Sequence, residues 1–211
     1  MSEQNQENKP VSKGAEHGRL LKEALLALPT LAIFYWISLP DQPLFGDGLE
    51  FLAAAQVGGV PHPTGYPLFM LLLAPFSGSY AAGSLLCALF GILAAFFASL
   101  LVGRFLTPSL SGFTEKNAFS VKNFITIIIG LSYSLWTAST VIEVYAFNAM
   151  LMMGGLMILF SNLQSICWRQ LSLAAFFVGL GMGNHLLIVS LIPLLGMRLI
   201  ESFRSGHTGA A

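Results

Sequence analysis

Long blocks of apolar residues fill most of this sequence and leave little polar surface to face water. Only 9% of its 211 residues are charged, whereas a soluble domain usually carries about 25%. A chain with so few charges needs the lipid bilayer as the solvent for most of its surface. The composition therefore predicts an integral membrane protein built as an all-α helix bundle. The formal net charge is zero, so nothing indicates nucleic acid binding.

The apolar blocks have the lengths that membrane helices need. Leu20–Leu39 would form about 30 Å of helix, enough to cross the hydrocarbon core. Ala81–Leu106 is rich in alanine, glycine and serine, which favour close helix packing in lipid. Phe124–Trp136 and Ala149–Ser161, each with a few flanking residues, are predicted as the third and fourth crossings. Val141–Asn148 is the predicted connection between them.

Two further blocks do not fit a single straight crossing. Pro67–Phe76 is too short to span and is predicted as a short helix that begins at its proline. Leu171–Ile200 would form about 45 Å of helix, well beyond a core of about 30 Å. Because polar residues lie near its middle, we expect a broken pair of short helices with Asn184-His185 near the bend. A single tilted helix is the alternative. In total, we expect about five to six transmembrane or re-entrant helices.

The charges predict which end of the bundle faces which side of the membrane. With a cytoplasmic N-terminus, lysines and arginines fall on the cytoplasmic side, as the positive-inside rule requires. The predicted transmembrane domain spans 19–204, with a structured first outer loop at 40–66, between disordered tails at 1–18 (cytoplasmic) and 205–211. The outer side then carries Asp41, Asp47, Glu50 and Glu143.

The acidic residues of the first outer loop have two interpretations. Asp47 and Glu50 are three residues apart at the start of an alanine-rich helix that ends at Gly58-Gly59, which is the spacing of a capping box. The spacing alone favours the cap, but a carboxylate at this place can also act as a general base, and the two roles can coexist at one helix start. The prolines that follow are expected to hold the residues before them, His62 and Tyr66 among them, in extended geometry.

Polar residues in the later apolar blocks pose the same choice. Glu143 would be costly deep in lipid, so it is expected to face the bundle interior or the outer surface. Asn184 and His185 would either stabilise a helix break or make a site polar. The sequence has no motif for a nucleotide phosphate, a dinucleotide, a serine hydrolase or zinc, and a lone histidine does not predict a metal site.

Four short motifs together resemble a known membrane family. They are GDGLE at Gly46–Glu50, HPTGYPLF at His62–Phe69, EVYAFN at Glu143–Asn148 and GLGMGNH at Gly179–His185. In this order they resemble the family formerly labelled DUF2723, which includes transmembrane protein O-mannosyltransferases and belongs with the GT-C glycosyltransferases. One departure is Thr64, where the family usually has a second proline.

The resemblance implies a GT-C-like bundle and a glycosyltransferase, or the N-terminal part of one. The sugar donor would be linked to a polyprenyl phosphate, the acceptor would be a hydroxyl group of a protein, and the reaction would take place on the extracytoplasmic face. It implies that Asp47 takes the acceptor proton, with Glu50 as a second candidate. The residues that would line the substrate site are His62, Tyr66, Glu143, Tyr145, Asn148, Asn184 and His185.

Several alternatives stay open from the sequence. A leaving phosphate needs positive charge, and the predicted outer side has neither lysine nor arginine. A divalent metal ion, His62, His185 or a missing C-terminal part would supply it. A second membrane subunit that completes the fold is an expected partner. A non-catalytic membrane scaffold or lipid-binding subunit with the same fold is the second hypothesis. A small transporter, in which Glu143 and His185 relay protons, is the third.

Overall fold

The structure is a computed structural model that describes residues 27–40, 42–43, 46–106, 115–162 and 166–204. Within these residues the chain is all-helical and has no strand, as predicted. Both predicted tails and Asp41 lie outside the described residues. In chain order the helices are α2 (Ala27–Ser38), α3 (Gly48–Val57), α4 (Pro67–Leu73), the 3-10 helix η1 (Ala74–Phe76), α5 (Tyr80–Leu106), α6 (Glu115–Gly130), α7 (Tyr133–Thr140), α8 (Val144–Leu159), α9 (Trp168–Met182), the 3-10 helix η2 (Leu186–Leu191) and α10 (Ile192–Arg204).

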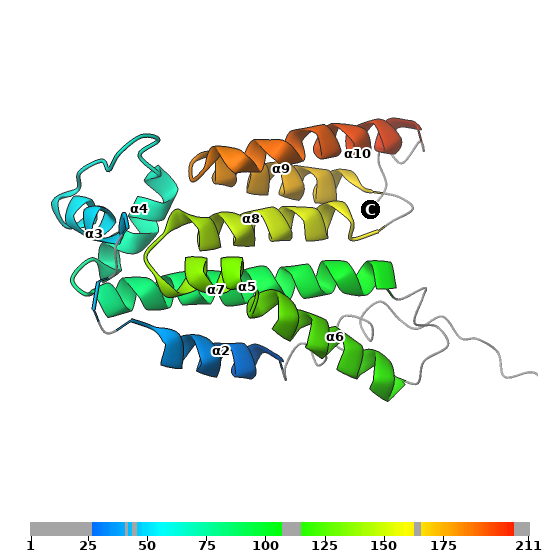
Figure 1. Ribbon diagram of the computed structural model, residues 1–211. Helices are drawn as coiled ribbons and strands as arrows, with labels where there is room; N and C mark the ends of the chain where they lie inside the picture. The colour runs from blue at the N-terminus through cyan, green and yellow to red at the C-terminus, as the bar shows by residue number, and fades with distance from the viewer. Residues whose placement is uncertain (1–26, 41, 44–45, 107–114, 163–165, 205–211) are drawn as a thin grey trace, which may run out of the picture.

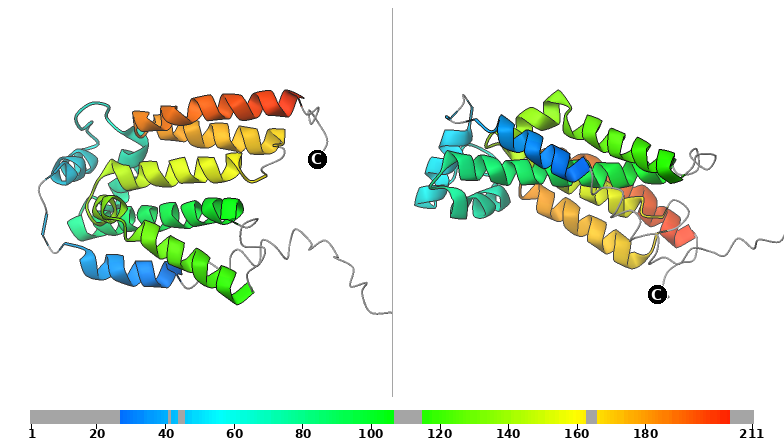
Figure 2. Two further views of the ribbon diagram at one scale, coloured as in Figure 1. Left: turned by 45° about the vertical axis from the view of Figure 1, so that its right-hand side comes forward. Right: turned by 90° about the horizontal axis from the view of Figure 1, so that it is seen from below.

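The long helices run side by side with α5 at the centre (Figure 1). Helix α8 packs along α5, α9 packs along α8, and η2 and α10 return beside α9, while α2, α6 and α7 also contact α5. The short helices α3 and α4 lie together at one end of the bundle, on the left of Figure 1 and in both views of Figure 2. We call this the α3 end. The α7–α8 connection and the break between α9 and η2 lie at the same end.

Small residues on α5 explain its central place. Gly83, Cys87, Gly91 and Ala95 recur at helical spacing and are buried, so neighbouring backbones approach closely, as predicted for this block. At Gly91 an added methyl group would lie 2.6 Å from the Ser139 Cβ atom of α7. The close contact of α5 and α7 therefore depends on a residue without a side chain.

In the part of the chain that the structure describes, two helices are long and apolar enough to cross a membrane, namely Tyr80–Leu106 and Leu186–Arg204. Other apolar helices, such as Ala27–Ser38 and Val144–Leu159, have only 10–17 residues. The five to six predicted crossings are therefore not confirmed. Large apolar side chains project outward along the bundle; for example, Trp36 is 65% exposed. Such outward faces, together with the two long apolar helices, fit a protein that lies in a membrane.

The block predicted as the third crossing is not one continuous helix, because Phe124–Trp136 is divided between α6 and α7 at Leu131-Ser132. A hydrogen bond between two residues that are far apart in the sequence stabilises this break. The Tyr35 hydroxyl of α2 donates to the carbonyl oxygen of Gly130, the last residue of α6, at 2.6 Å. This hydrogen bond satisfies a carbonyl group that a continuous helix would pair internally. The connection predicted over Val141–Asn148 is also too long, because α8 already begins at Val144.

The last apolar block forms a broken pair of helices, as predicted. Helix α9 ends at Met182, η2 begins at Leu186, and α10 runs back beside α9. The break is held to the rest of the fold, because the Leu68 backbone N–H donates to the Gly183 carbonyl oxygen at 3.2 Å. The short helix predicted over Pro67–Phe76 is also confirmed, as α4 followed by η1.

Candidate functional site

Four segments that are distant in the sequence meet at the α3 end. They are the start of α3, the loop between α3 and α4, the α7–α8 connection and the break between α9 and η2. Gly46 allows the turn into α3, since its φ is +139° and a Cβ atom there would lie 3.3 Å from Glu143 Oε1. A glycine is therefore needed both for the backbone conformation and for the close approach of Glu143.

Glu50 points at the α3–α4 loop and does not cap its own helix. Its Oε1 atom accepts the backbone N–H of His62 at 2.6 Å, and its Oε2 atom lies 3.0 Å from His62 Nδ1. Asp47 occupies the N-cap position of α3 but makes no side-chain capping hydrogen bond. The predicted capping box is therefore wrong. The hydrogen bond from the His62 backbone N–H is the main reason why the pKa of Glu50 is lowered.

The His62 ring lies between the two carboxylates of α3. Its Nε2 atom is 3.6 Å from Asp47 Oδ2 and 3.3 Å from the Tyr66 hydroxyl oxygen. The loop reverses at Gly65, whose backbone N–H donates to the His62 carbonyl oxygen at 3.0 Å. The Asp47 side chain remains 51% exposed. Of the two α3 carboxylates, Asp47 is thus the one that is not used to fix the loop.

Tyr66 departs from the extended geometry that we predicted for residues before proline. Its φ is 44° and its ψ is 52°, in the left-handed region, which is uncommon for a residue other than glycine. Its ring packs edge-on against Phe51 and stacks on His185 with ring centroids 6.3 Å apart. These packing contacts outweigh the preference of a residue before proline for extended geometry. Burial is the main cause that raises the pKa of the Tyr66 phenol, so the hydroxyl stays protonated and can donate.

Glu143 lies in the short α7–α8 connection, directly before α8, and is half-buried. Its carboxylate accepts a hydrogen bond from the Asp47 backbone. Burial raises the pKa of Glu143, and the nearby negative charge of Asp47 raises it further. Glu143 is therefore neither deep among the helices nor simply exposed to water. It lies beside the other carboxylates at the α3 end.

Tyr145 and His185 extend the same surface. Tyr145, in the first turn of α8, is 50% exposed, and its ring centroid lies 5.5 Å from that of His185. His185 also stabilises the helix break, because its Nδ1 atom accepts the Leu187 backbone N–H at 3.2 Å. Of the two roles considered for His185, the stabilisation of the helix break is therefore confirmed. His62, Tyr66, Tyr145 and His185 form one continuous set of rings.

The two predicted asparagines lie inside the bundle. Asn184 is 1% exposed, and its Nδ2 atom donates to the Val144 carbonyl oxygen at 3.2 Å. This bond ties the α9–η2 break to the start of α8. Asn148 is 3% exposed, and its Nδ2 atom lies 3.3 Å from Met152 Sδ. Among the described contacts, neither asparagine reaches the carboxylates directly, so Asn184 stabilises the helix break, which is one of the two roles considered for it.

The structure brings together a possible set of metal ligands that we did not predict. Asp47, Glu50 and His62 each offer one ligand atom, and these atoms lie within 4.8 Å of one another. Carboxylate and imidazole groups are suitable ligands for divalent ions such as zinc. The sequence contained no signal for this set, because the eleven residues between Glu50 and His62 follow no metal motif.

The lysines and arginines of the described ranges lie on helix segments away from the α3 end. Arg104 donates to the Ser161 carbonyl oxygen, and Arg198 donates to the Leu159 carbonyl oxygen at 3.1 Å, both near the end of α8. Within the described ranges, the α3 end carries no lysine or arginine. All those that the ranges contain are Arg104, Lys116, Lys122, Arg169, Arg198 and Arg204.

The chain was compared with known proteins. The model of the family "Protein O-mannosyl-transferase TMEM260 N-terminal domain" matches residues 47–206. Protein O-mannosyl-transferase TMEM260 of Mus musculus is 30% identical over 196 residues, which cover 86% of this chain but only 26% of the mouse protein. No solved structure matches the chain. The family match covers most of the chain and contains every predicted site residue. The chain therefore belongs to the protein O-mannosyl-transferase TMEM260 N-terminal domain family.

Proposed function

We propose that this chain is the N-terminal, GT-C-like part of a membrane glycosyltransferase that transfers mannose to a hydroxyl group of a protein. The donor is mannose linked to a polyprenyl phosphate. The reaction takes place at the α3 end, on the extracytoplasmic face, and the N-terminus is cytoplasmic. This proposal combines the family membership with the placement of the described lysines and arginines away from the end of the bundle that carries Asp47, Glu50 and Glu143, which follows the positive-inside rule.

The observation that carries the proposal is that the three carboxylates at the α3 end differ in their hydrogen bonds. Glu50 is bonded to His62, and Glu143 accepts a hydrogen bond from the Asp47 backbone. The Asp47 carboxylate remains half exposed. A general base must reach the proton that it takes. Asp47 is therefore the base, while Glu50 and Glu143 position it and the loop around it.

The reaction that we propose is a direct displacement at the sugar. The acceptor oxygen attacks the anomeric carbon, and the bond between this carbon and the phosphate oxygen breaks. The electron pair leaves with the polyprenyl phosphate, and the hydroxyl proton passes to the Asp47 carboxylate. The partly exposed ring of His185 and the exposed ring of Tyr145 offer a polar aromatic surface on which the sugar can lie, and the buried Tyr66 ring stacks against His185 beneath it.

Transfer of label from polyprenyl-phosphate mannose, in membranes that contain the full-length protein, tests this role. Asp47→Asn keeps the shape of the side chain but removes the base, so transfer should fall by about 10²–10⁴-fold. Glu201→Gln is the matched control, because Glu201 is a half-exposed carboxylate on α10, away from the α3 end. Unchanged transfer by Asp47→Asn would show that Asp47 is not the base.

One observation favours a second candidate, a non-catalytic lipid-binding subunit. The leaving phosphate needs positive charge, and the α3 end has no lysine or arginine among the residues described. A divalent ion held by Asp47, Glu50 and His62, or a partner subunit, would supply this charge to an enzyme. Membranes in which the wild-type protein binds the donor lipid but transfers no sugar would favour the non-catalytic subunit.

A further inference from the structure

The His185 ring is held in one orientation and one tautomer. Its Nδ1 atom accepts the Leu187 backbone N–H at 3.2 Å, so the ring proton lies on the other nitrogen, Nε2. The backbone is fixed as well, because the His185 N–H donates to the Gly181 carbonyl oxygen at 2.8 Å. The ring stacks on Tyr66 and lies beside Tyr145. His185 therefore offers an N–H donor in a fixed place at the α3 end.

This donor is available to a ligand. His185 is partly exposed, and its Nε2 atom has no hydrogen-bond partner among the described contacts. The ring of His62, in contrast, is already paired. Its Nδ1 atom lies 3.0 Å from Glu50 Oε2, and its Nε2 atom lies 3.3 Å from the Tyr66 hydroxyl oxygen. Of the two histidines at the α3 end, His185 is thus the one that can donate to a substrate.

The electrostatics of the α3 end separate the place of a phosphate from the place of the base. A phosphate beside the carboxylates of α3 would meet like charge, and the described ranges have no lysine or arginine at this end. A neutral sugar can lie beside the same carboxylates. Contacts run from Asp47 to His62, then to Tyr66 and then to His185. Two rings therefore lie between the Asp47 carboxylate and the His185 donor.

This arrangement also suits the proposed direct displacement. In such a reaction the base and the leaving group lie on opposite faces of the anomeric carbon. Successive ring centroids are 5.5 Å apart from His62 to Tyr66 and 6.3 Å apart from Tyr66 to His185. A sugar that lies over these rings has Asp47 on one side and the His185 N–H on the other. His185 is therefore on the side where the phosphate leaves.

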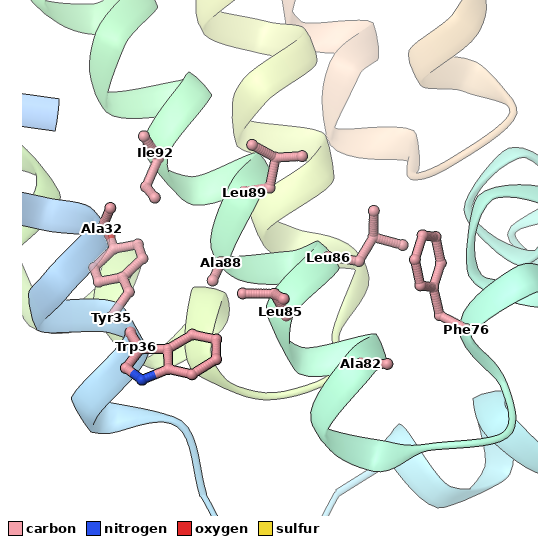
Figure 3. Close-up of a pocket in the computed structure, with 10 residues that line it drawn as sticks. All are labelled: Ala32, Tyr35, Trp36, Phe76, Ala82, Leu85, Leu86, Ala88, Leu89 and Ile92. Atoms are coloured by element: carbon pink, nitrogen blue, oxygen red, sulfur yellow. The ribbon is translucent and has the colours of Figure 1, made fainter. Parts of the chain in front are cut away.

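The apolar groove between α2 and α5 offers a phosphate no comparable contact (Figure 3). The residues that line it, among them Ala32, Trp36 and Leu89, include no charged side chain and no histidine. Tyr35 contributes its ring, but its hydroxyl is bonded to the Gly130 carbonyl oxygen. A phosphate would lose its hydration there and gain no charged partner. The His185 donor is the better partner for this group.

We propose that the His185 Nε2–H group donates a hydrogen bond to the phosphate of polyprenyl-phosphate mannose and is a catalytic residue of the transfer. This inference rests on the proposed function. The acceptor oxygen bonds to the anomeric carbon, the bond from this carbon to the phosphate oxygen breaks, and its electron pair stays on the phosphate. The acceptor proton passes to Asp47, and His185 keeps its own. Because the phosphate gains one negative charge, the hydrogen bond from His185 strengthens as the reaction proceeds.

Three replacements of His185 separate the N–H donor from the other roles of this residue. His185→Asn keeps an acceptor for the Leu187 N–H, because asparagine is a favoured residue at the start of a helix, but it has no group at the place of Nε2. His185→Phe keeps a ring that stacks on Tyr66 but has no donor. His185→Gln loses the ring and carries an amide N–H group that reaches about as far from the backbone as Nε2.

Sugar transfer from polyprenyl-phosphate mannose, by the full-length protein in membranes, ranks these variants. We expect kcat to fall about 10²-fold in His185→Asn and in His185→Phe, and to fall less in His185→Gln. If His185 served only as a ring under the sugar, His185→Phe would be the most active of the three, and that order would overturn the inference. Ser190→Ala is the matched control. It removes another hydrogen bond of η2, from Ser190 Oγ to the Leu187 carbonyl oxygen at 2.8 Å, and should leave kcat near the wild-type value.

Binding of the product lipid tests the contact with the phosphate without any reaction. Polyprenyl phosphate and polyprenol with the same chain are each titrated against the full-length protein in phosphatidylcholine vesicles. His185→Asn should weaken the binding of polyprenyl phosphate about 10-fold and leave the binding of polyprenol unchanged. An equal loss for both lipids, or no loss for either, would overturn the inference.

The two measurements distinguish a failure of this inference from a failure of the proposed function. A wild-type protein that transfers no sugar, but loses affinity for polyprenyl phosphate in His185→Asn, would support the phosphate contact and contradict the enzyme. Sugar transfer that Asp47→Asn abolishes and His185→Asn leaves unchanged would support the enzyme and contradict the role of His185.

Discussion

Both carboxylate oxygens of Glu50 contact His62, one at the backbone and one at the ring. Oε1 accepts the backbone N–H at 2.6 Å, and Oε2 lies 3.0 Å from Nδ1. This pair joins the first turn of α3 to the loop that leads into α4. It also places the other ring nitrogen of His62 towards Asp47. The position of this loop should therefore depend on the charge of Glu50.

We predict that Glu50→Gln loosens the α3–α4 loop. A neutral amide accepts the His62 backbone N–H less strongly, so amide hydrogen exchange in residues 58–66 should become about 3- to 10-fold faster at pH 7. His62→Ala should have a smaller effect, because it keeps the backbone hydrogen bond. Equal exchange in wild type and Glu50→Gln would contradict a role for this pair in holding the loop.

The pH dependence of this effect follows from the lowered pKa of Glu50 in the folded state. A carboxylate whose folded pKa is depressed contributes stability above its ordinary pKa of 4.5, and this contribution is lost as the pH falls through the folded pKa. After correction for intrinsic exchange, the difference between wild type and Glu50→Gln should be full at pH 6–7 and should shrink below about pH 4.5.

Glu143 should show the opposite pH dependence. Its pKa is raised in the folded state by burial and by the charge of Asp47, so the fold disfavours its ionised form at neutral pH. We predict that Glu143→Gln raises the melting temperature of the detergent-solubilised protein at pH 7. The gain should decrease as the pH is lowered through the folded pKa, and it should vanish below 4.5, the ordinary pKa of the group.

Sugar transfer by the same variant distinguishes a functional Glu143 from a structural one. If Glu143 serves the reaction although it lowers the stability of the fold, its replacement should give a protein that is more stable but less active. We therefore expect Glu143→Gln to transfer less sugar than the wild type while it melts at a higher temperature. A Glu143→Gln variant with higher stability and full activity would show that Glu143 has no role in sugar transfer.

The break in the last apolar block could be predicted from the sequence because it follows from local chemistry. A polar pair in the middle of a block too long for one crossing indicates an interruption. The structure gives Asn184 a buried partner, the Val144 carbonyl oxygen, and gives His185 the Leu187 backbone N–H. The break between α6 and α7 had no such signal. It depends on Tyr35, which lies 95 residues before Gly130 in the sequence.

The gathering of the site residues could be predicted only in part. Motif order and charge placement predicted which segments share an end of the bundle. They did not predict that Glu50 would bond His62, because the spacing of Asp47 and Glu50 equally suits a capping box. The direction of a carboxylate depends on where the chain reverses, here at Gly58 and Gly65, which both adopt positive φ. Sequence spacing alone does not determine that path.

Arg198 provides a test of the basic end of the bundle. It is 5% exposed, and it donates to the carbonyl oxygens of Leu159 and Asn162 and pairs with Glu201. Arg198→Met should destabilise the fold by about 2–4 kcal/mol, because buried carbonyl groups at the end of α8 lose charged donors. Thermal unfolding in detergent measures this loss. Glu201→Gln should cost much less, since Glu201 is 54% exposed.

The contact between α5 and α7 provides the last test. A methyl group at Gly91 would lie 2.6 Å from Ser139 Cβ and 3.1 Å from the Tyr35 ring, both fixed by packing. Gly91→Ala should therefore cost about 1–3 kcal/mol, because the helices must separate. Gly179 on α9 is the matched control, since a Cβ atom there meets nothing within 4 Å. Gly179→Ala should be neutral or should stabilise by up to about 1 kcal/mol, because alanine favours the helix. A comparison of melting temperatures checks both variants, and equal effects at the two positions would contradict the close approach of α5 and α7.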